Sequence, residues 1–77
     1  MGRRVDINTA SREELKLLPG IGEVLAERIV ERRALLRKDG KGFYSLLELK
    51  EINGIGEKKF EAIYSYVKVD TNLGKGR

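Results

Sequence analysis

The residues of this 77-residue chain that are best suited to chemistry are two copies of a glycine turn. The tripeptide Gly-Ile-Gly occurs twice, 34 residues apart, at Gly20, Ile21 and Gly22 and at Gly54, Ile55 and Gly56. In each copy the first glycine can adopt a positive φ without steric cost, and the second leaves room for close approach to the backbone. A helix that starts behind such a turn has unpaired amides and the positive end of its dipole pointing outward. The pattern therefore predicts two phosphate-binding turns that need no basic side chain.

The similarity between the two halves extends beyond the glycines. Residues 10–33 align with residues 44–67, with further identities at Ser11/Ser45, Glu14/Glu48, Leu15/Leu49, Lys16/Lys50, Glu27/Glu61 and Ile29/Ile63. The repeat is therefore a structural unit and not one recurring tripeptide. Because a core of this size is marginal, we expect each copy to depend on the other.

The elements that must hold the turns are helical. In each copy a Ser-x-x-Glu sequence, at Ser11 and at Ser45, has the spacing of a capping box at a helix start. Apolar residues then recur at three- and four-residue steps on both sides of the glycines: Leu15, Leu18, Ile21, Leu25 and Ile29, then Leu49, Ile52, Ile55, Ile63 and Val67. This pattern predicts helices over residues 12–18, 23–37, 46–52 and 57–67 after an extended lead-in at 5–10. The predicted fold is all-α, with two pseudo-symmetric helical hairpins packed as one small domain.

The remaining segments have simpler interpretations. Residues 1–4 are expected to form a flexible arm and residues 70–77 a disordered basic tail, which leaves 5–69 as the domain. We assign Phe43 and Tyr44 to packing of the linker on the core. The charged face of the second helix is interpreted as solvated; it contains Glu27, Arg28, Glu31, Arg32 and Arg33.

Composition argues against an enzyme. The chain has no cysteine and no histidine, which removes disulfides, thiolate–metal sites and the commonest general base. The carboxylates, such as Asp6 and Glu51, form no tight cluster, so we expect no catalytic residue and no metal site. A dinucleotide-binding Gly-x-Gly-x-x-Gly motif is also excluded, because its third glycine position is Leu25 in one copy and Lys59 in the other. No apolar run is long enough to span a bilayer, so we expect no membrane insertion by this segment.

The excess positive charge lies at the two ends of the chain. The net charge is +4, yet basic and acidic residues are equal in number between residues 5 and 67, so the excess lies in the two ends. Within the core, Lys58 and Lys59 come directly behind the second turn, in the first turn of the predicted helix. That position favours contact with phosphate.

Taken in order, these pieces resemble the double helix-hairpin-helix domain, (HhH)2 or SAM-like in type, and within it the ComEA-like competence DNA receptors. The resemblance covers residues 5–69 and rests on the lead-in Val5-Asp6-Ile7-Asn8-Thr9-Ala10-Ser11, on Glu14-Leu15, on Leu18-Pro19-Gly20-Ile21-Gly22, on Ala26 and Ile29-Val30, on Gly42-Phe43, and on Gly54-Ile55-Gly56-Glu57-Lys58-Lys59. It implies a monomer that binds double-stranded DNA without sequence preference, through backbone amides. The site residues it implies are Gly20, Ile21, Gly22, Gly54, Ile55, Gly56, Lys58 and Lys59. It implies no resident cofactor, although hairpins of this family can hold a monovalent cation on backbone carbonyls.

Two departures from the family pattern bear on function. After the first turn the chain has Glu23, Val24 and Leu25 where a basic residue would help, so we expect unequal hairpins with the second one dominant. The family's receptors also carry a membrane anchor and a linker ahead of this domain, which this sequence lacks. The compartment therefore stays open: cell envelope or extracellular space for a domain of an anchored receptor, and cytoplasm if this is the whole chain.

Two other functions remain open at this point. Paired helical hairpins also serve as dimerisation modules, for which the candidate apolar patch is Val24, Leu25, Tyr64 and Tyr66. The domain could equally be the DNA-holding accessory of a nuclease or repair enzyme. Its physical chemistry would then be the same as in DNA uptake.

Overall fold

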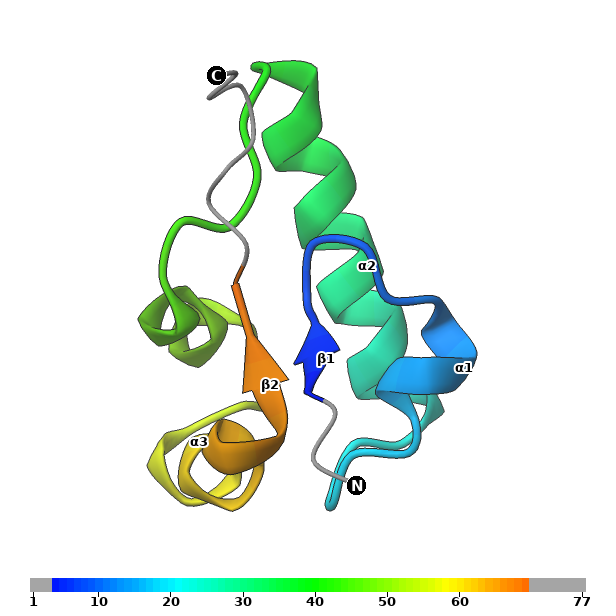
Figure 1. Ribbon diagram of the computed structural model, residues 1–77, viewed down its shortest axis with the longest axis vertical. Helices are drawn as coiled ribbons and strands as arrows, with labels where there is room; N and C mark the ends of the chain where they lie inside the picture. Colours follow the sequence, from blue (N-terminus) through cyan, green and yellow to red (C-terminus); the bar gives the residue numbers. More distant parts are fainter. Residues whose placement is uncertain (1–3, 70–77) are drawn as a thin grey trace.

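The computed structural model describes residues 4–69, and the predictions for residues 1–3 and 70–77 lie outside this part of the chain. Two helical hairpins flank a central pair of short strands (Figure 1). In chain order the elements are β1 (Val5–Asp6), α1 (Arg12–Leu15), α2 (Glu23–Lys38), the 3-10 helix η1 (Leu46–Glu51), α3 (Glu57–Ile63), the 3-10 helix η2 (Tyr64–Tyr66) and β2 (Val67–Lys68). The predicted all-α architecture is confirmed, with one strand pair added to it.

Both predicted capping boxes are present, and they set where each hairpin begins. The Ser11 Oγ accepts from the Glu14 amide at 3.1 Å, and the Glu14 carboxylate accepts from the Ser11 amide at 2.9 Å. In the second copy the Ser45 Oγ accepts from the Leu47 amide at 3.1 Å, while Glu48 accepts from the Ser45 amide at 3.2 Å. Each serine therefore starts its helix at the residue that the sequence predicts.

The first helix of each hairpin is shorter or tighter than predicted. Helix α1 ends at Leu15, and the chain continues through 3.1 Å bonds from Leu17 to the Glu14 carbonyl and from Leu18 to the Leu15 carbonyl. Its counterpart η1 is a 3-10 helix throughout. The α-helices predicted at 12–18 and 46–52 are wrong in this respect. Bonds between residues three apart tighten the chain just before the glycine turn.

The end of the chain also differs from the prediction of one helix over 57–67. Helix α3 stops at Ile63, η2 follows, and Val67 then lies in a strand whose parallel partner is Val5. The Ile7 amide extends the pairing by donating to the Lys68 carbonyl at 3.1 Å. Val67 is buried, as its apolar periodicity predicts. Its strand conformation comes from pairing with the other end of the domain, which local sequence does not encode.

One core joins the two hairpins. It contains nearly all of the apolar residues predicted to face inward, while Leu25 is partly buried and packs against it. The buried set is Ile7, Ala10, Leu15, Leu18, Ile21, Ala26, Ile29, Phe43, Leu49, Ile52, Ile55, Phe60, Ile63 and Val67. Phe43 is fully buried, as predicted, but Tyr44 is 56% exposed, so its assignment to packing is wrong.

The lead-in is fixed to the linker by one buried side chain. The Asn8 amide group donates to the Phe43 carbonyl at 2.9 Å, and its oxygen accepts from the Phe43 amide at 2.8 Å. Asn8 is 2% exposed, so this reciprocal pair satisfies both polar ends of a side chain that water does not reach.

Helix α2 holds the same segment from its other side. Arg33 donates to the carbonyls of Ile7 at 3.0 Å and Ala10 at 2.9 Å, and Arg37 donates to the Asn8 carbonyl at 2.6 Å. Partial burial lowers the pKa of Arg33, with repulsion from Arg37 as a further cause. The prediction that this charged face is simply solvated is therefore wrong for Arg33.

We expect Asn8→Ala to lower the free energy of unfolding by about 3 kcal/mol, because the buried Phe43 amide and carbonyl would lose their partners. Chemical denaturation followed by circular dichroism measures this loss. The matched control is Thr9→Ala at the exposed neighbouring position, which should change stability by less than about 0.5 kcal/mol. An Asn8→Ala loss no larger than that of the control would contradict the proposed role of this pair.

Candidate nucleic-acid interface

The two glycine turns have nearly the same backbone geometry. The first glycine of each turn has a positive φ, 79° at Gly20 and 101° at Gly54. The second glycine is extended and is the N-cap residue of the following helix, with φ −98° and ψ −165° at Gly22 and φ −100° and ψ −162° at Gly56. The positive φ predicted for the first glycine is confirmed in both turns.

The helix starts behind the turns carry unpaired amides. Neither N-cap is closed by a side-chain hydrogen bond, because glycine has no side chain to supply one. The first bonds of the helical ladders run from Ala26 to the Gly22 carbonyl and from Phe60 to the Gly56 carbonyl, both at 2.9 Å. The amides before Ala26 and Phe60 at these helix starts are therefore the ones that can face a ligand. A Cβ built at Gly22 or at Gly56 would meet nothing within 4 Å, so the backbone is open to close approach there.

The isoleucines between the glycines have an internal role. Ile21 and Ile55 are 3% and 2% exposed, and their amides donate to the carbonyls of Leu18 at 3.1 Å and Ile52 at 2.9 Å. Their side chains and amides are both occupied inside the protein. Ile21 and Ile55 therefore anchor the turns from inside the protein, and a contact of either residue with DNA stays a prediction.

Each turn is covered by the helix that follows the other turn. A Cβ built on Gly54 would lie 2.6 Å from Cδ2 of Leu25, and one built on Gly20 would lie 3.8 Å from Nζ of Lys59. Leu25 and Lys59 occupy the same position in the two repeats. This reciprocal contact explains why the position after the first turn is apolar: Leu25 packs against the second turn.

Arg28 is a site residue that sequence reasoning missed. Its Nη1 donates to the Asn53 carbonyl at 2.8 Å, directly before Gly54. One helical turn further along, Arg32 pairs with Glu51 at 3.5 Å. In the sequence Arg28 is one of several charges on a helix face, and no local signal connects it to the second turn.

An ion pair spans each turn at equivalent positions. Lys16 pairs with Glu23 at 3.8 Å, and Lys50 pairs with Glu57 at 3.1 Å. Both glutamates are the first residue of the helix behind the turn, where a carboxylate interacts favourably with the helix dipole. All four residues are identical between the repeats, which is the signal that could have revealed these pairs. Each carboxylate also adds negative charge beside a predicted phosphate site.

The two predicted lysines lie in the first turn of α3, as expected, but their side chains differ. Lys58 is exposed, whereas Lys59 is partly buried. Lys59 crosses toward the first turn, where its Cγ would lie 3.9 Å from a Cβ on Gly20. The structure therefore brings Lys59 together with Gly20, although the sequence places it behind Gly56.

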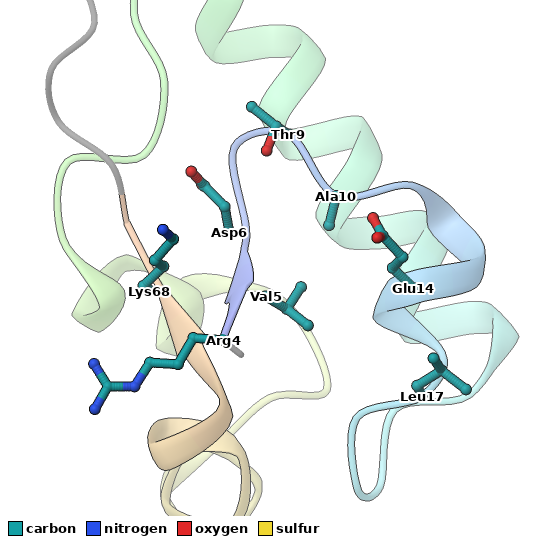
Figure 2. A pocket seen from close by; sticks show the side chains of 8 residues that line it. All are labelled: Arg4, Val5, Asp6, Thr9, Ala10, Glu14, Leu17 and Lys68. Atoms are coloured by element: carbon teal, nitrogen blue, oxygen red, sulfur yellow. The ribbon is translucent and has the colours of Figure 1, made fainter. Parts of the chain in front are cut away.

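A separate hollow lies between the strand pair and α1 (Figure 2). It measures about 820 Å³, with Arg4 and Lys68 on the strand side and Glu14 and Leu17 on the α1 side. Because its lining carries both signs of charge and contains none of the turn glycines, it provides no focused anion site. Within residues 4–69, histidine, cysteine, aspartate and glutamate form no group of three suited to a metal ion. No helix in this part of the chain has the length and apolar character to cross a membrane.

The apolar residues considered for dimerisation differ in their exposure. Val24, Tyr64 and Tyr66 are 62%, 54% and 54% exposed, but Leu25 is partly buried against the core. Val24 borders a hollow with charged residues of α2. Tyr66 borders a separate hollow beside Leu17.

Known proteins share this sequence pattern. The family model described as the helix-hairpin-helix motif matches residues 2–68. ComE operon protein 1 of Bacillus subtilis is 38% identical over 68 residues, which cover 88% of this chain and 31% of that protein. A deoxyribonuclease of Thioalkalivibrio is 44% identical over 59 residues, covering 77% of this chain and 14% of the relative. Endonuclease/exonuclease/phosphatase family domain-containing protein 1 of Danio rerio is 42% identical over 60 residues, 78% of this chain and 10% of that protein. The chain thus spans less than a third of each of these relatives.

The two positive-φ glycines should differ in their tolerance of a side chain. We expect Gly20→Ala to cost about 1 kcal/mol of stability because of its left-handed backbone. Gly54→Ala should cost at least about 1 kcal/mol more, because Leu25 and Arg28 must also move. Thermal unfolding of the two variants measures the difference. Equal losses would show that Leu25 yields without cost.

Proposed function

The chain belongs to the helix-hairpin-helix motif family, and from that premise we propose that it binds double-stranded DNA through phosphates, without reading base sequence. The observation that carries the proposal is the pair of glycine turns, each followed by a helix start whose amides are unpaired and whose backbone is open. Amides at a helix start bind anions through hydrogen bonds and through the helix dipole. Two such turns in one rigid domain suit two phosphates of one duplex.

In the proposed mechanism the backbone amides at the turns bind the DNA phosphates. Phosphate oxygens accept hydrogen bonds from the amides that follow Gly22 and Gly56, where a side chain on either glycine would stand in the way. Gly20 and Gly54 supply the turns that aim these amides. Lys58 adds an exposed cation beside the second turn. Contacts of this kind position a protein on the duplex but carry no base information, so sequence preference should be nearly absent.

Affinity should be modest and should depend steeply on salt. Few phosphates are engaged, and the residues between 5 and 67 carry equal numbers of acidic and basic groups. Each neutralised phosphate releases counterions, so log K should fall against log salt with a slope of about −0.9 per contact. A flat salt dependence would contradict phosphate binding.

Two biological settings suit this module. The match to ComE operon protein 1 supports a role in DNA uptake. The resemblance of the sequence to competence DNA receptors suggests the same role. The match to a deoxyribonuclease supports a second candidate, in which the module holds DNA for a catalytic domain of a longer protein. In both settings we assign the chain itself a binding role as a monomer and no reaction.

The decisive test replaces the open glycines by aspartate. Gly22→Asp and Gly56→Asp should each weaken binding to a random-sequence duplex at least about tenfold, because a carboxylate would occupy the amides and repel phosphate. The same variants should keep or gain stability, because aspartate is a favoured N-cap residue. Fluorescence anisotropy measures binding and circular dichroism measures unfolding.

The matched controls are Gly22→Asn and Gly56→Asn, which cap the helix without adding charge. They should weaken binding less than the aspartate variants at low salt, and the difference should shrink as salt rises. If the aspartate variants bind as tightly as the parent chain, the turns are structural and the proposal fails. Sedimentation would then test for a dimer that covers them.

The repeated ion pairs give a second, opposite prediction. Glu57→Gln should strengthen duplex binding about fivefold at low salt, because it removes a negative charge beside the proposed phosphate and releases Lys50. The control is Glu61→Gln on the same helix, which changes the net charge equally one turn farther from the helix start. Equal gains in the two variants would attribute the effect to net charge alone.

A further inference from the structure

Lys59 lies in the second repeat but approaches the turn of the first. Both its Cγ and its Nζ come within 4 Å of a Cβ built on Gly20, at 3.9 Å and 3.8 Å. The side chain therefore runs along the glycine with its aliphatic stem while its ammonium group stays at the same turn. Long basic side chains commonly combine these two roles.

The other half of the molecule shows what this contact is built from. At the equivalent position Leu25 packs against Gly54, at 2.6 Å from a built Cβ. In both repeats the side chain at this position packs against the glycine of the opposite turn, but the side chain is apolar in one repeat and basic in the other. Leucine makes an apolar contact with the second turn, whereas lysine makes a similar contact with the first turn and adds a charge.

The two turns also differ in the basic side chains that lie near them. The helix behind that turn begins with Glu23, Val24 and Leu25, so its first three residues supply no cation. Lys16 is engaged by Glu23 at 3.8 Å. The second turn, by contrast, has Lys58 in its own helix and the Arg28 guanidinium on the Asn53 carbonyl at 2.8 Å. Lys59 therefore brings to the first turn a cation that the start of its own following helix does not supply.

We propose that Lys59 contacts the DNA phosphate held at the first turn, so that this contact site is assembled from both repeats. This inference rests on the proposed DNA binding and assigns Lys59 to the hairpin opposite to the one that sequence order suggests. It has a structural consequence: neither repeat alone contains the complete first site. The spacing of the two bound phosphates is then fixed by the contacts between the repeats.

The test is a pair of double-mutant cycles on the full chain with a random-sequence duplex. Lys59→Met removes the charge and keeps an apolar stem on Gly20, and Lys58→Met is its matched control. Gly22→Ala and Gly56→Ala each block one turn at a glycine where a Cβ meets no atom within 4 Å. Anisotropy titrations give the affinity and the salt slope of each variant.

Lys59→Met alone should weaken binding about fivefold and make the salt slope shallower by about 0.9. Combined with Gly22→Ala, it should add less than about twofold to the loss, because both changes remove the same contact. Combined with Gly56→Ala, the two losses should multiply. Lys58→Met should show the reverse pattern.

Coupling of Lys59→Met to Gly56→Ala, with independence from Gly22→Ala, would overturn this inference and leave DNA binding intact. So would a Lys59→Met variant that binds with the affinity and salt slope of the parent chain. No binding by the parent chain at low salt would overturn the proposed function, and this inference with it.

Discussion

The reciprocal covering of the two glycine turns is the contact on which the rest of the structure depends. Leu25 from the first repeat lies on Gly54, and Lys59 from the second lies beside Gly20. Both glycines have a positive φ, so each can form its turn and also admit a side chain from the opposite helix. Together with the shared core, this arrangement holds the two hairpins against each other. It thereby sets the spacing between the two helix starts that we propose as phosphate contacts.

Polar contacts complete the assembly around this centre. Arg28 ties α2 to the carbonyl before the second turn, while Arg33 ties the same helix to the lead-in. Asn8 joins the lead-in to the linker, and β1 pairs with β2 across the ends of the domain. A domain this small has limited apolar area to bury. Hydrogen bonds from side chains to backbone carbonyls therefore hold segments that lie outside the helices and strands.

The small number of available positive charges also bears on the proposed DNA binding. The described domain has no strong excess of positive charge, and several of its arginines are committed to internal carbonyls. Under the proposed function, the affinity for DNA comes from backbone amides and a few lysines at the turns. The paired glutamates at the helix starts oppose this attraction at short range.

The sequence alone determined the features that depend on local chemistry. The capping boxes, the glycine turns, the starts of α2 and α3 and nearly all of the core follow from residue type and spacing, because each is set within a few residues. Tertiary structure decided the features that join distant segments. Four features depend on which segments meet in space: the strand at Val67, the exposure of Tyr44, the hydrogen bond from Arg28 to the Asn53 carbonyl, and the approach of Lys59 to Gly20. The residues around Lys59 in the sequence do not encode these contacts, so the sequence predicts that Lys59 acts at the second turn. Only the packing of the two repeats brings Lys59 beside Gly20.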